Sequence, residues 1–207
     1  MLSDGIIDVF DAASAGFAGR LRLARPLQWT GPTPCSDWSV RQLVNHVAQG
    51  NLNYGRLLAG ATAAEFLRMR DVDALGDDPV AGFDASARAC RAAFTAPGAL
   101  ERVLDHPLGR VPGWQGLAVR TADTVIHTWD LARAISADEV LDPSLVLWIT
   151  DHLGEIYADL PEMPTATVTT HRFFAAPLAS PADGSLQDRL LRLTGRDPDH
   201  GQDPAHR

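Results

Sequence analysis

The chain has 207 residues, of which 45% are hydrophobic and 21% charged, so it is long enough to bury the core of one globular domain. Its formal net charge of -8 argues against a nucleic-acid-binding surface, because phosphate neutralisation needs clustered lysines and arginines. No run approaches the ~20 apolar residues of a membrane span, and the first residues lack the basic start of a signal peptide. We therefore predict a cytoplasmic protein that contacts neither nucleic acid nor membrane.

Two helices are predicted in the first third of the chain. About residues 4–25 carry apolar side chains at helical spacing, and Pro26 follows them. The second helix is expected to begin at Ser39, because Gln42 three residues later completes the pattern of a capping box, and to end near Gly60. Its apolar side is formed by Val40, Leu43, Val44, Val47, Leu52, Leu57 and Leu58.

Three more helices are predicted in the middle of the chain. Residues 61–78 read as a connection with at most one helical turn, and a helix with proline in its first turn follows over about residues 79–94. The prolines and glycines of residues 99–113 predict a loop with at most a short extended piece. The helix over about residues 115–135 is apolar nearly all round, which is typical of a helix buried among others, and the last spans about 143–159.

Prolines punctuate the rest of the chain from Pro161 onward, where one short helix over about residues 185–193 is expected. These elements predict an all-α protein, a four-helix bundle with an additional helix and a proline-rich C-terminal tail. Residues 1–160 are expected to form the bundle, and residues 161–207 a tail packed on it with a frayed end.

Three residues on two predicted helices could bind a metal ion. Asp123 and His127 are four residues apart on the most buried helix, so both side chains project from one face. His46 lies on the apolar side of the second helix. A buried carboxylate is costly without a cation, and helical bundles build metal sites from inward carboxylates and histidines. The alternative is a hydrogen-bonded Asp–His pair and a packed histidine without metal.

Further residues near these three could support such a site. Asp130 follows His127 by three residues and could be a fourth ligand or an acceptor that fixes the ring of His127. A salt bridge from Asp130 to Arg133 or Arg120 is the alternative. Arg133 could bind an anionic substrate group, and Trp114, predicted in a loop, could line a pocket.

Cys35 stands just ahead of the second helix, where a helix dipole would stabilise a thiolate. It is a candidate reactive thiol, with an ordinary small residue as the alternative. With only Cys35 and Cys90 present and far apart, a disulfide framework is not expected. Trp38 is interpreted as a packing residue.

Two stretches of the chain resemble motifs of the DinB/YfiT-like metalloenzyme superfamily. TPCSDWSVRQLVNH, from Thr33 to His46, resembles its opening motif and is closest to the actinobacterial branch that includes the N-terminal domain of mycothiol-dependent maleylpyruvate isomerase. ADTVIHTWDLARA, from Ala122 to Ala134, resembles the second motif of that branch. The segments RFFAAP, QDRLL and GRDP near the C-terminus resemble the tail of a metal-binding subgroup.

The resemblance implies a DinB-like four-helix bundle that holds a divalent ion, zinc first and nickel second, through His46, Asp123 and His127. The isomerase has glutamate at the position of Asp123, and it carries a second domain where this chain has a proline-rich tail. The resemblance also implies a small-molecule or thiol partner and a homodimer. No catalytic side chain is identified.

Three functions follow from this resemblance and from the residues themselves. The first is a metal-dependent thiol S-transferase or isomerase-like enzyme that uses a mycothiol-type thiol as cosubstrate. The second is a non-catalytic metal-binding or stress-response protein. The third is a helical interaction module whose Asp–His pair is purely structural.

Overall fold

The computed structural model describes residues 3–35, 38–160, 175–181 and 183–199. The chain divides into two compact units, Met1–Ala158 and Asp159–Arg207, and each is described by itself. In the described residues, no helix combines the length and the apolar character that crossing a membrane requires.

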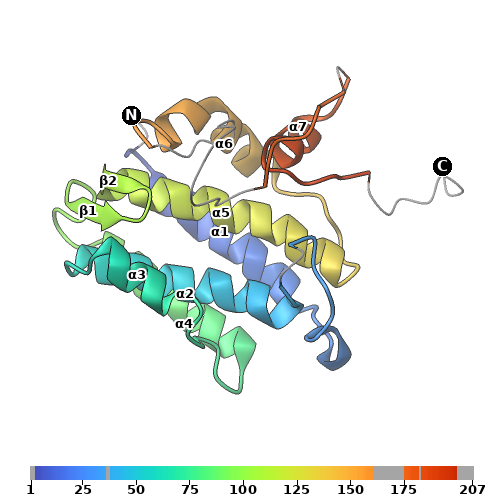
Figure 1. The fold of residues 1–207 in the computed structure, drawn as a ribbon, viewed down its shortest axis with the longest axis horizontal. Coiled ribbons are helices and arrows are strands. Elements are labelled where there is room, and N and C mark those ends of the chain that lie inside the picture. The colour runs from blue at the N-terminus through green and yellow to red at the C-terminus, as the bar shows by residue number, and fades with distance from the viewer. Residues whose placement is uncertain (1–2, 36–37, 161–174, 182, 200–207) are drawn as a thin grey trace, which may run out of the picture. The chain divides into compact units, whose positions relative to one another are not determined.

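Four helices of the first unit form a bundle: α1 (Ile6–Leu21), α2 (Val40–Leu58), α4 (Pro79–Phe94) and α5 (Gly113–Ala134). Helices α1 and α2 each pack against both α4 and α5, so the four surround one shared core (Figure 1). This arrangement confirms the predicted all-α fold. The core is made of the apolar faces of these helices, among them Phe17, Leu43, Val44, Val47, Phe83 and Leu131.

Local signals fix where the bundle helices begin. The backbone N–H of Ser39 donates to Oε1 of Gln42 at 2.9 Å, and Ser39 Oγ accepts from the Gln42 backbone, so the predicted capping box is confirmed. Asp78 Oδ1 accepts from two backbone N–H groups at the start of α4, with Pro79 as the first helical residue. The first helix ends at Leu21 rather than near residue 25. The backbone of Arg25, the residue before Pro26, is extended and so cannot continue the helix.

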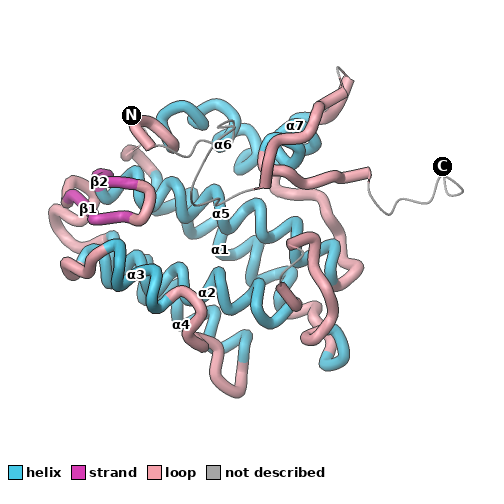
Figure 2. Tube along the Cα trace, in the orientation of Figure 1, coloured by secondary structure: helices cyan, strands magenta, loops and turns pink. Residues whose placement is uncertain are grey.

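Two connecting segments contain more regular structure than the sequence indicated. Helix α3 (Ala63–Met69) lies in the connection after α2, and a capping box of Thr62 and Glu65 begins it. Strands β1 (Val103–His106) and β2 (Gly109–Pro112) form an antiparallel hairpin where a loop was expected (Figure 2). The hairpin tolerates its prolines because one lies in the two-residue turn and the other ends a strand.

Helix α6 (Pro143–Ile156) packs on α5 and α1, and it ends three residues earlier than expected. In the second unit, α7 (Leu186–Leu193) matches the short helix predicted there, with Ser185 as its N-cap. Residues 161–174, which include part of the RFFAAP motif, lie outside the described residues. The predicted packing of the tail on the bundle stays a prediction.

Gly113 is expected to be required at the start of α5. A Cβ atom at this position would lie 2.1 Å from the backbone oxygen of Ala99, which cannot yield as a flexible side chain could. We expect Gly113→Ala to lower the free energy of unfolding by about 1–3 kcal/mol, measured by urea denaturation. Gly154→Ala on α6 is the matched control, because a Cβ there meets nothing within 4 Å and should be neutral or stabilising.

Candidate metal centre

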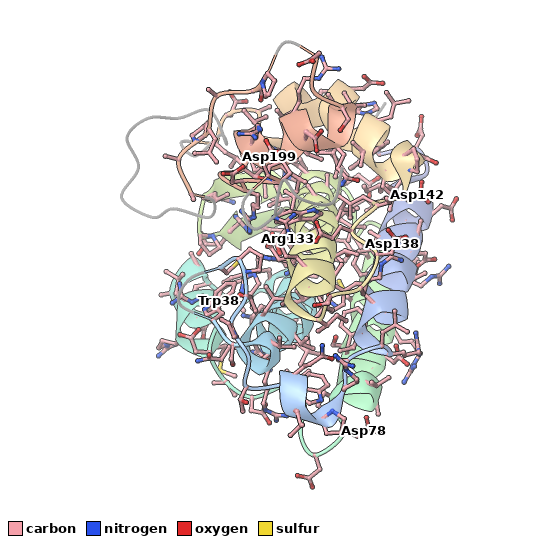
Figure 3. The ribbon with its side chains drawn as sticks, turned by 90° about the vertical axis from the view of Figure 1, so that its right-hand side faces the viewer. Trp38, Asp78, Arg133, Asp138, Asp142 and Asp199 are labelled. Carbon is pink, nitrogen blue, oxygen red and sulfur yellow. The ribbon has the colours of Figure 1, made fainter. Side chains whose placement is uncertain are left out.

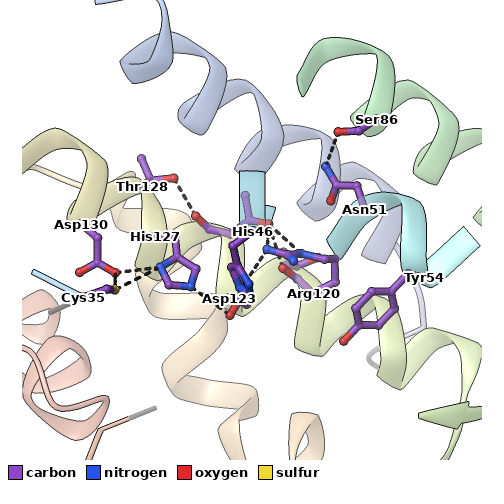
Figure 4. Close-up of polar contacts among 12 residues, drawn as sticks. Cys35, His46, Asn51, Tyr54, Ser86, Arg120, Asp123, His127, Thr128 and Asp130 are labelled. Atoms are coloured by element: carbon purple, nitrogen blue, oxygen red, sulfur yellow. Dashed lines mark hydrogen bonds and ion pairs between the residues drawn. The ribbon is translucent and has the colours of Figure 1, made fainter. Parts of the chain in front are cut away.

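The structure brings His46, Asp123 and His127 together between α2 and α5 (Figure 4). His46 Nε2 lies 3.4 Å from Asp123 Oδ2, and His127 Nε2 lies 3.4 Å from Asp123 Oδ1. One donor atom from each residue can be chosen so that all lie within 4.8 Å of one another. The Asp–His spacing on α5 places two of them on one face, and the packing of α2 against α5 supplies the third.

The His46 side chain has an unsatisfied nitrogen that faces this group. Its Nε2 is buried and makes no hydrogen bond within the described part of the chain. On one side of the imidazole, the ring of Trp38 stacks at 4.5 Å between centroids, and on another the ring of His127 meets it edge-on at 4.9 Å. Trp38 therefore covers the candidate site, in addition to packing as the sequence suggested.

Arg120 pairs with Asp123 at the site, and the sequence interpretation missed this contact. It lies one turn before Asp123 on α5 and is only 3% exposed. Its Nη2 donates to Asp123 Oδ2 and, at 3.1 Å, to Thr124 Oγ1. The guanidinium passes so close to α2 that a Cβ on Gly50 would lie 2.0 Å from Nη1. Arg120 thus compensates the charge of Asp123.

The charges of the group are strongly coupled. Burial alone would raise the pKa of Asp123, but Arg120, His127 and His46 hold that pKa well below its ordinary value. Burial alone would lower the pKa of His127, but Asp123, Asp130 and Cys35 keep it well above the ordinary value. Burial lowers the pKa of His46, despite the opposing pull of Asp123. Of the two histidines, His46 is therefore the one with a neutral imidazole in the metal-free protein.

Asp130 and Cys35 lie on the other edge of the His127 ring. Asp130 Oδ2 is 2.8 Å from His127 Nδ1, and the Asp130 carboxylate is completely buried. This contact is the one expected of an acceptor that fixes the orientation of His127. Cys35 Sγ lies 3.4 Å from Asp130 Oδ2 and 4.0 Å from His127 Nδ1. Nothing in the sequence paired Cys35 with these residues, because 92 positions separate it from His127.

The remaining predicted residues lie away from the three donors. Arg133 pairs with Glu139 at 2.7 Å, and its guanidinium stacks over the Trp129 ring at 4.4 Å. Figure 3 faces the end of the bundle where α2 begins and α5 ends, and it labels Trp38 and Arg133 there. Trp114 is in the first turn of α5 rather than in a loop, about 13 Å along the helix axis from Asp123.

The fold and the site together define a helical-bundle protein with two histidines and one carboxylate gathered between two of its helices. The chain belongs to the family described as the mycothiol maleylpyruvate isomerase N-terminal domain, whose family model matches residues 10–132. The resemblance seen in the two sequence motifs is thereby confirmed.

Two relatives and one solved structure accompany this family match. The uncharacterized proteins Rv0738 and MT0763, from two strains of Mycobacterium tuberculosis, are each 37% identical over 135 residues, which cover 65% of this chain and 70% of the relative. The crystal structure of the mycothiol-dependent maleylpyruvate isomerase matches with a TM-score of 0.57 at 15% identity, over 73% of this chain and 69% of that one. At this level of identity, the structural likeness shows the fold alone.

Proposed function

We propose that the protein binds one divalent metal ion through His46, Asp123 and His127, and that it uses the ion in thiol chemistry. In this proposal a mycothiol-type thiol is the cosubstrate of a transferase or isomerase-like reaction. The observation that carries the proposal is the buried Nε2 of His46, which faces a carboxylate and a second imidazole without a hydrogen bond of its own in the described residues. Family membership supports the thiol as the partner.

The donor set suits a borderline divalent ion. Zinc binds nitrogen and carboxylate oxygen at about 2.0–2.2 Å in tetrahedral geometry, so neighbouring donors should stand about 3.3–3.6 Å apart. The 3.4 Å between His127 Nε2 and Asp123 Oδ1 falls in this range, and His46 Nε2 lies 3.4 Å from the other carboxylate oxygen, Oδ2. Two imidazoles with one carboxylate favour zinc, and they also suit nickel. Three protein ligands leave a coordination position open for a small molecule.

The side chains around the donors would prepare them for the ion. A bound ion would supply Lewis-acid activation, which lowers the pKa of a thiol or water molecule beside it. Arg120, in contrast, pairs with Oδ2 of Asp123 and competes with the ion for this carboxylate, while Oδ1 faces His127. Asp130 accepts from Nδ1 of His127, which keeps the lone pair on Nε2 toward the site. Trp38 shields the imidazole of His46 from water.

Metal binding by the purified protein tests the proposal. Zinc is expected to bind at one ion per chain, and His46→Ala should weaken its affinity by more than about 100-fold. His152→Ala is the matched control, because this half-buried histidine on α6 bonds only the Trp148 carbonyl oxygen among the contacts described. Quenching of Trp38 fluorescence by Co²⁺ gives a second readout at the site. Equal zinc affinity in the His46→Ala and wild-type proteins would refute the site.

A thiol-dependent reaction separates the enzyme from its alternatives. The enzyme should consume an electrophilic substrate only when zinc and a low-molecular-weight thiol are both present, and His46→Ala should abolish turnover. Stoichiometric zinc without turnover would favour a metal-binding or stress-response protein. The contact between Arg120 and Asp123 favours the third function, an interaction module, because it compensates the carboxylate without metal. Absence of zinc binding would select that module.

Asp130→Asn is expected to weaken zinc binding by about 10–100-fold while the fold is retained. The amide can present its NH₂ group to His127 Nδ1, so the contact no longer requires the hydrogen to reside on Nδ1. The ring would then lose the preference that keeps the Nε2 lone pair toward the site. Calorimetric zinc titration measures the change, and circular dichroism checks the fold. An unchanged affinity would mean that Asp130 does not position the ring.

The expected homodimer and the cytoplasmic location stay predictions. Sedimentation velocity on the full chain tests the first, and a monomer at micromolar concentration would refute it.

A further inference from the structure

A second group of possible metal ligands lies on the opposite edge of the His127 ring. Cys35 Sγ, Asp130 Oδ2 and His127 Nδ1 can each donate to a common point, and all three atoms lie within 4.8 Å of one another. We propose that these residues form a second cation site, which takes a thiophilic divalent ion such as Cd²⁺. This site is distinct from the one built by His46 and Asp123, although both include His127.

The spacing of the three atoms suits one tetrahedral ion. Zinc–sulfur bonds of about 2.3 Å and zinc–nitrogen or zinc–oxygen bonds of about 2.0–2.2 Å place neighbouring donors about 3.3–3.6 Å apart. The observed separations are 4.0 Å for Sγ to Nδ1, 3.4 Å for Sγ to Oδ2, and 2.8 Å for Nδ1 to Oδ2. They bracket the required distance, so each side chain needs to move by well under 1 Å.

The local structure holds Cys35 in place beside α5. The hydroxyl of Thr33 accepts from the Cys35 backbone N–H at 3.1 Å and lies 2.9 Å from the carbonyl oxygen of Trp38. A bridge between Pro32 and Ser39 closes the same loop just before α2 begins. The thiol is half-buried, whereas the two α5 residues are buried, so an ion could enter from the side of the cysteine.

Charge also favours a cation at this position. The Asp130 carboxylate has no exposed surface, and both His127 Nδ1 and the Cys35 thiol lie within contact distance of its Oδ2. When the thiol of Cys35 gives up its proton to bind a metal, thiolate and carboxylate together carry two negative charges, which one divalent ion neutralises. The thiolate selects soft ions, whereas the set of His46, Asp123 and His127 has no sulfur and does not.

The two sites are alternatives, because a neutral imidazole offers one lone pair. When His127 binds an ion through Nδ1, its Nε2 carries the hydrogen and faces Asp123 Oδ1 at 3.4 Å. When it binds through Nε2, Nδ1 carries the hydrogen and donates to Asp130. The protein therefore holds one ion per chain, and the identity of the ion decides which edge of His127 is used.

Titration with CdCl₂ alone tests the second site, because cadmium bound to thiolate has a charge-transfer band in the ultraviolet. We expect the wild-type absorbance to rise and to saturate at one ion per chain. Cys35→Ser should abolish this band, whereas His46→Ala should retain it. Cys90→Ser is the matched control and should also retain it, because Cys90 is fully buried on α4 and burial raises its pKa to about 12.

Two results would overturn the proposal: cadmium bound without a thiolate band in the wild-type protein, or a band that persists in Cys35→Ser. Failure of cadmium to bind the wild-type protein would also overturn it. Cadmium X-ray absorption on the wild-type protein keeps the test independent of variant folding, since one sulfur in the first coordination shell is expected. The proposed function fails separately, when His46→Ala leaves zinc affinity unchanged.

Discussion

Acidification from pH 7 to pH 4 is expected to cost the protein about 3 kcal/mol of folding stability through His106 alone. This histidine ends β1 and is 2% exposed, and burial lowers its pKa from 6.5 to about 4. Its Nδ1 accepts the backbone N–H of Leu108 at 3.1 Å, and its Nε2 lies 2.8 Å from the Tyr54 hydroxyl. The neutral ring therefore donates through Nε2, and a second proton would break the bond from Leu108.

The direction of the effect follows from which state binds the proton. Below the unfolded-state pKa of 6.5, the unfolded chain takes up a proton at His106 while the folded chain does not, until the pH nears 4. The stability contribution is thus complete above pH 6.5 and is lost as the pH falls through this window. A difference of 2.5 pKa units, 6.5 minus 4, corresponds to about 3 kcal/mol.

Comparison of two asparagine variants isolates this contribution from other acid-sensitive groups. His106→Asn keeps an acceptor near Leu108 but removes the titration, so its stability should fall by about 3 kcal/mol less than that of the wild-type protein over the same range. His152→Asn, at a half-buried histidine on α6, is the control for the substitution itself. Urea denaturation at several pH values measures both. An unchanged pH dependence in His106→Asn would contradict the prediction.

The parts of the fold that the sequence predicted correctly depend on local chemistry. Ser39 with Gln42 and Asp78 with Pro79 specify helix starts within a few residues, because caps satisfy backbone groups that no tertiary contact needs to supply. The Thr62–Glu65 box carries the same signal for α3, in the segment that was predicted to be a connection. The hairpin of residues 103–112 was harder to predict, since the pairing of two four-residue strands shows only a weak pattern and two prolines lie within it.

The residues of the site fall into the same two groups: those that local spacing predicts and those that helix packing brings in. Asp123 and His127 could be paired from their spacing, since residues four apart on a helix share a face. Whether His46 and Cys35 join them depends on how α2 and its preceding loop pack on α5, which the spacing along the chain does not encode. Arg120 could have been recognised, because it lies three residues before Asp123, and Gly50 in mid-helix indicated a close neighbour.

The Arg120 side chain has the largest expected effect on stability, because it is a buried charge paired with a buried carboxylate. Its side chain is 3% exposed, and that of Arg91, which pairs with Asp11 at 2.7 Å, is 49% exposed. Removing one partner of a buried pair leaves an uncompensated charge and costs about 3–5 kcal/mol, whereas an exposed pair contributes about 1 kcal/mol or less. Arg91→Met is therefore the matched control for Arg120→Met.

Arg120→Met is expected to lower the free energy of unfolding of the metal-free protein by about 3–5 kcal/mol, measured in urea with a chelator present. The same variant should bind zinc more tightly than the wild type, because the cation that competes for Asp123 is gone. Zinc should consequently raise its melting temperature more than it raises that of the wild-type protein. An arginine with a purely structural role would lower stability without this gain. Equal stabilisation by zinc in both proteins would therefore mean that Arg120 does not influence metal binding at the proposed centre.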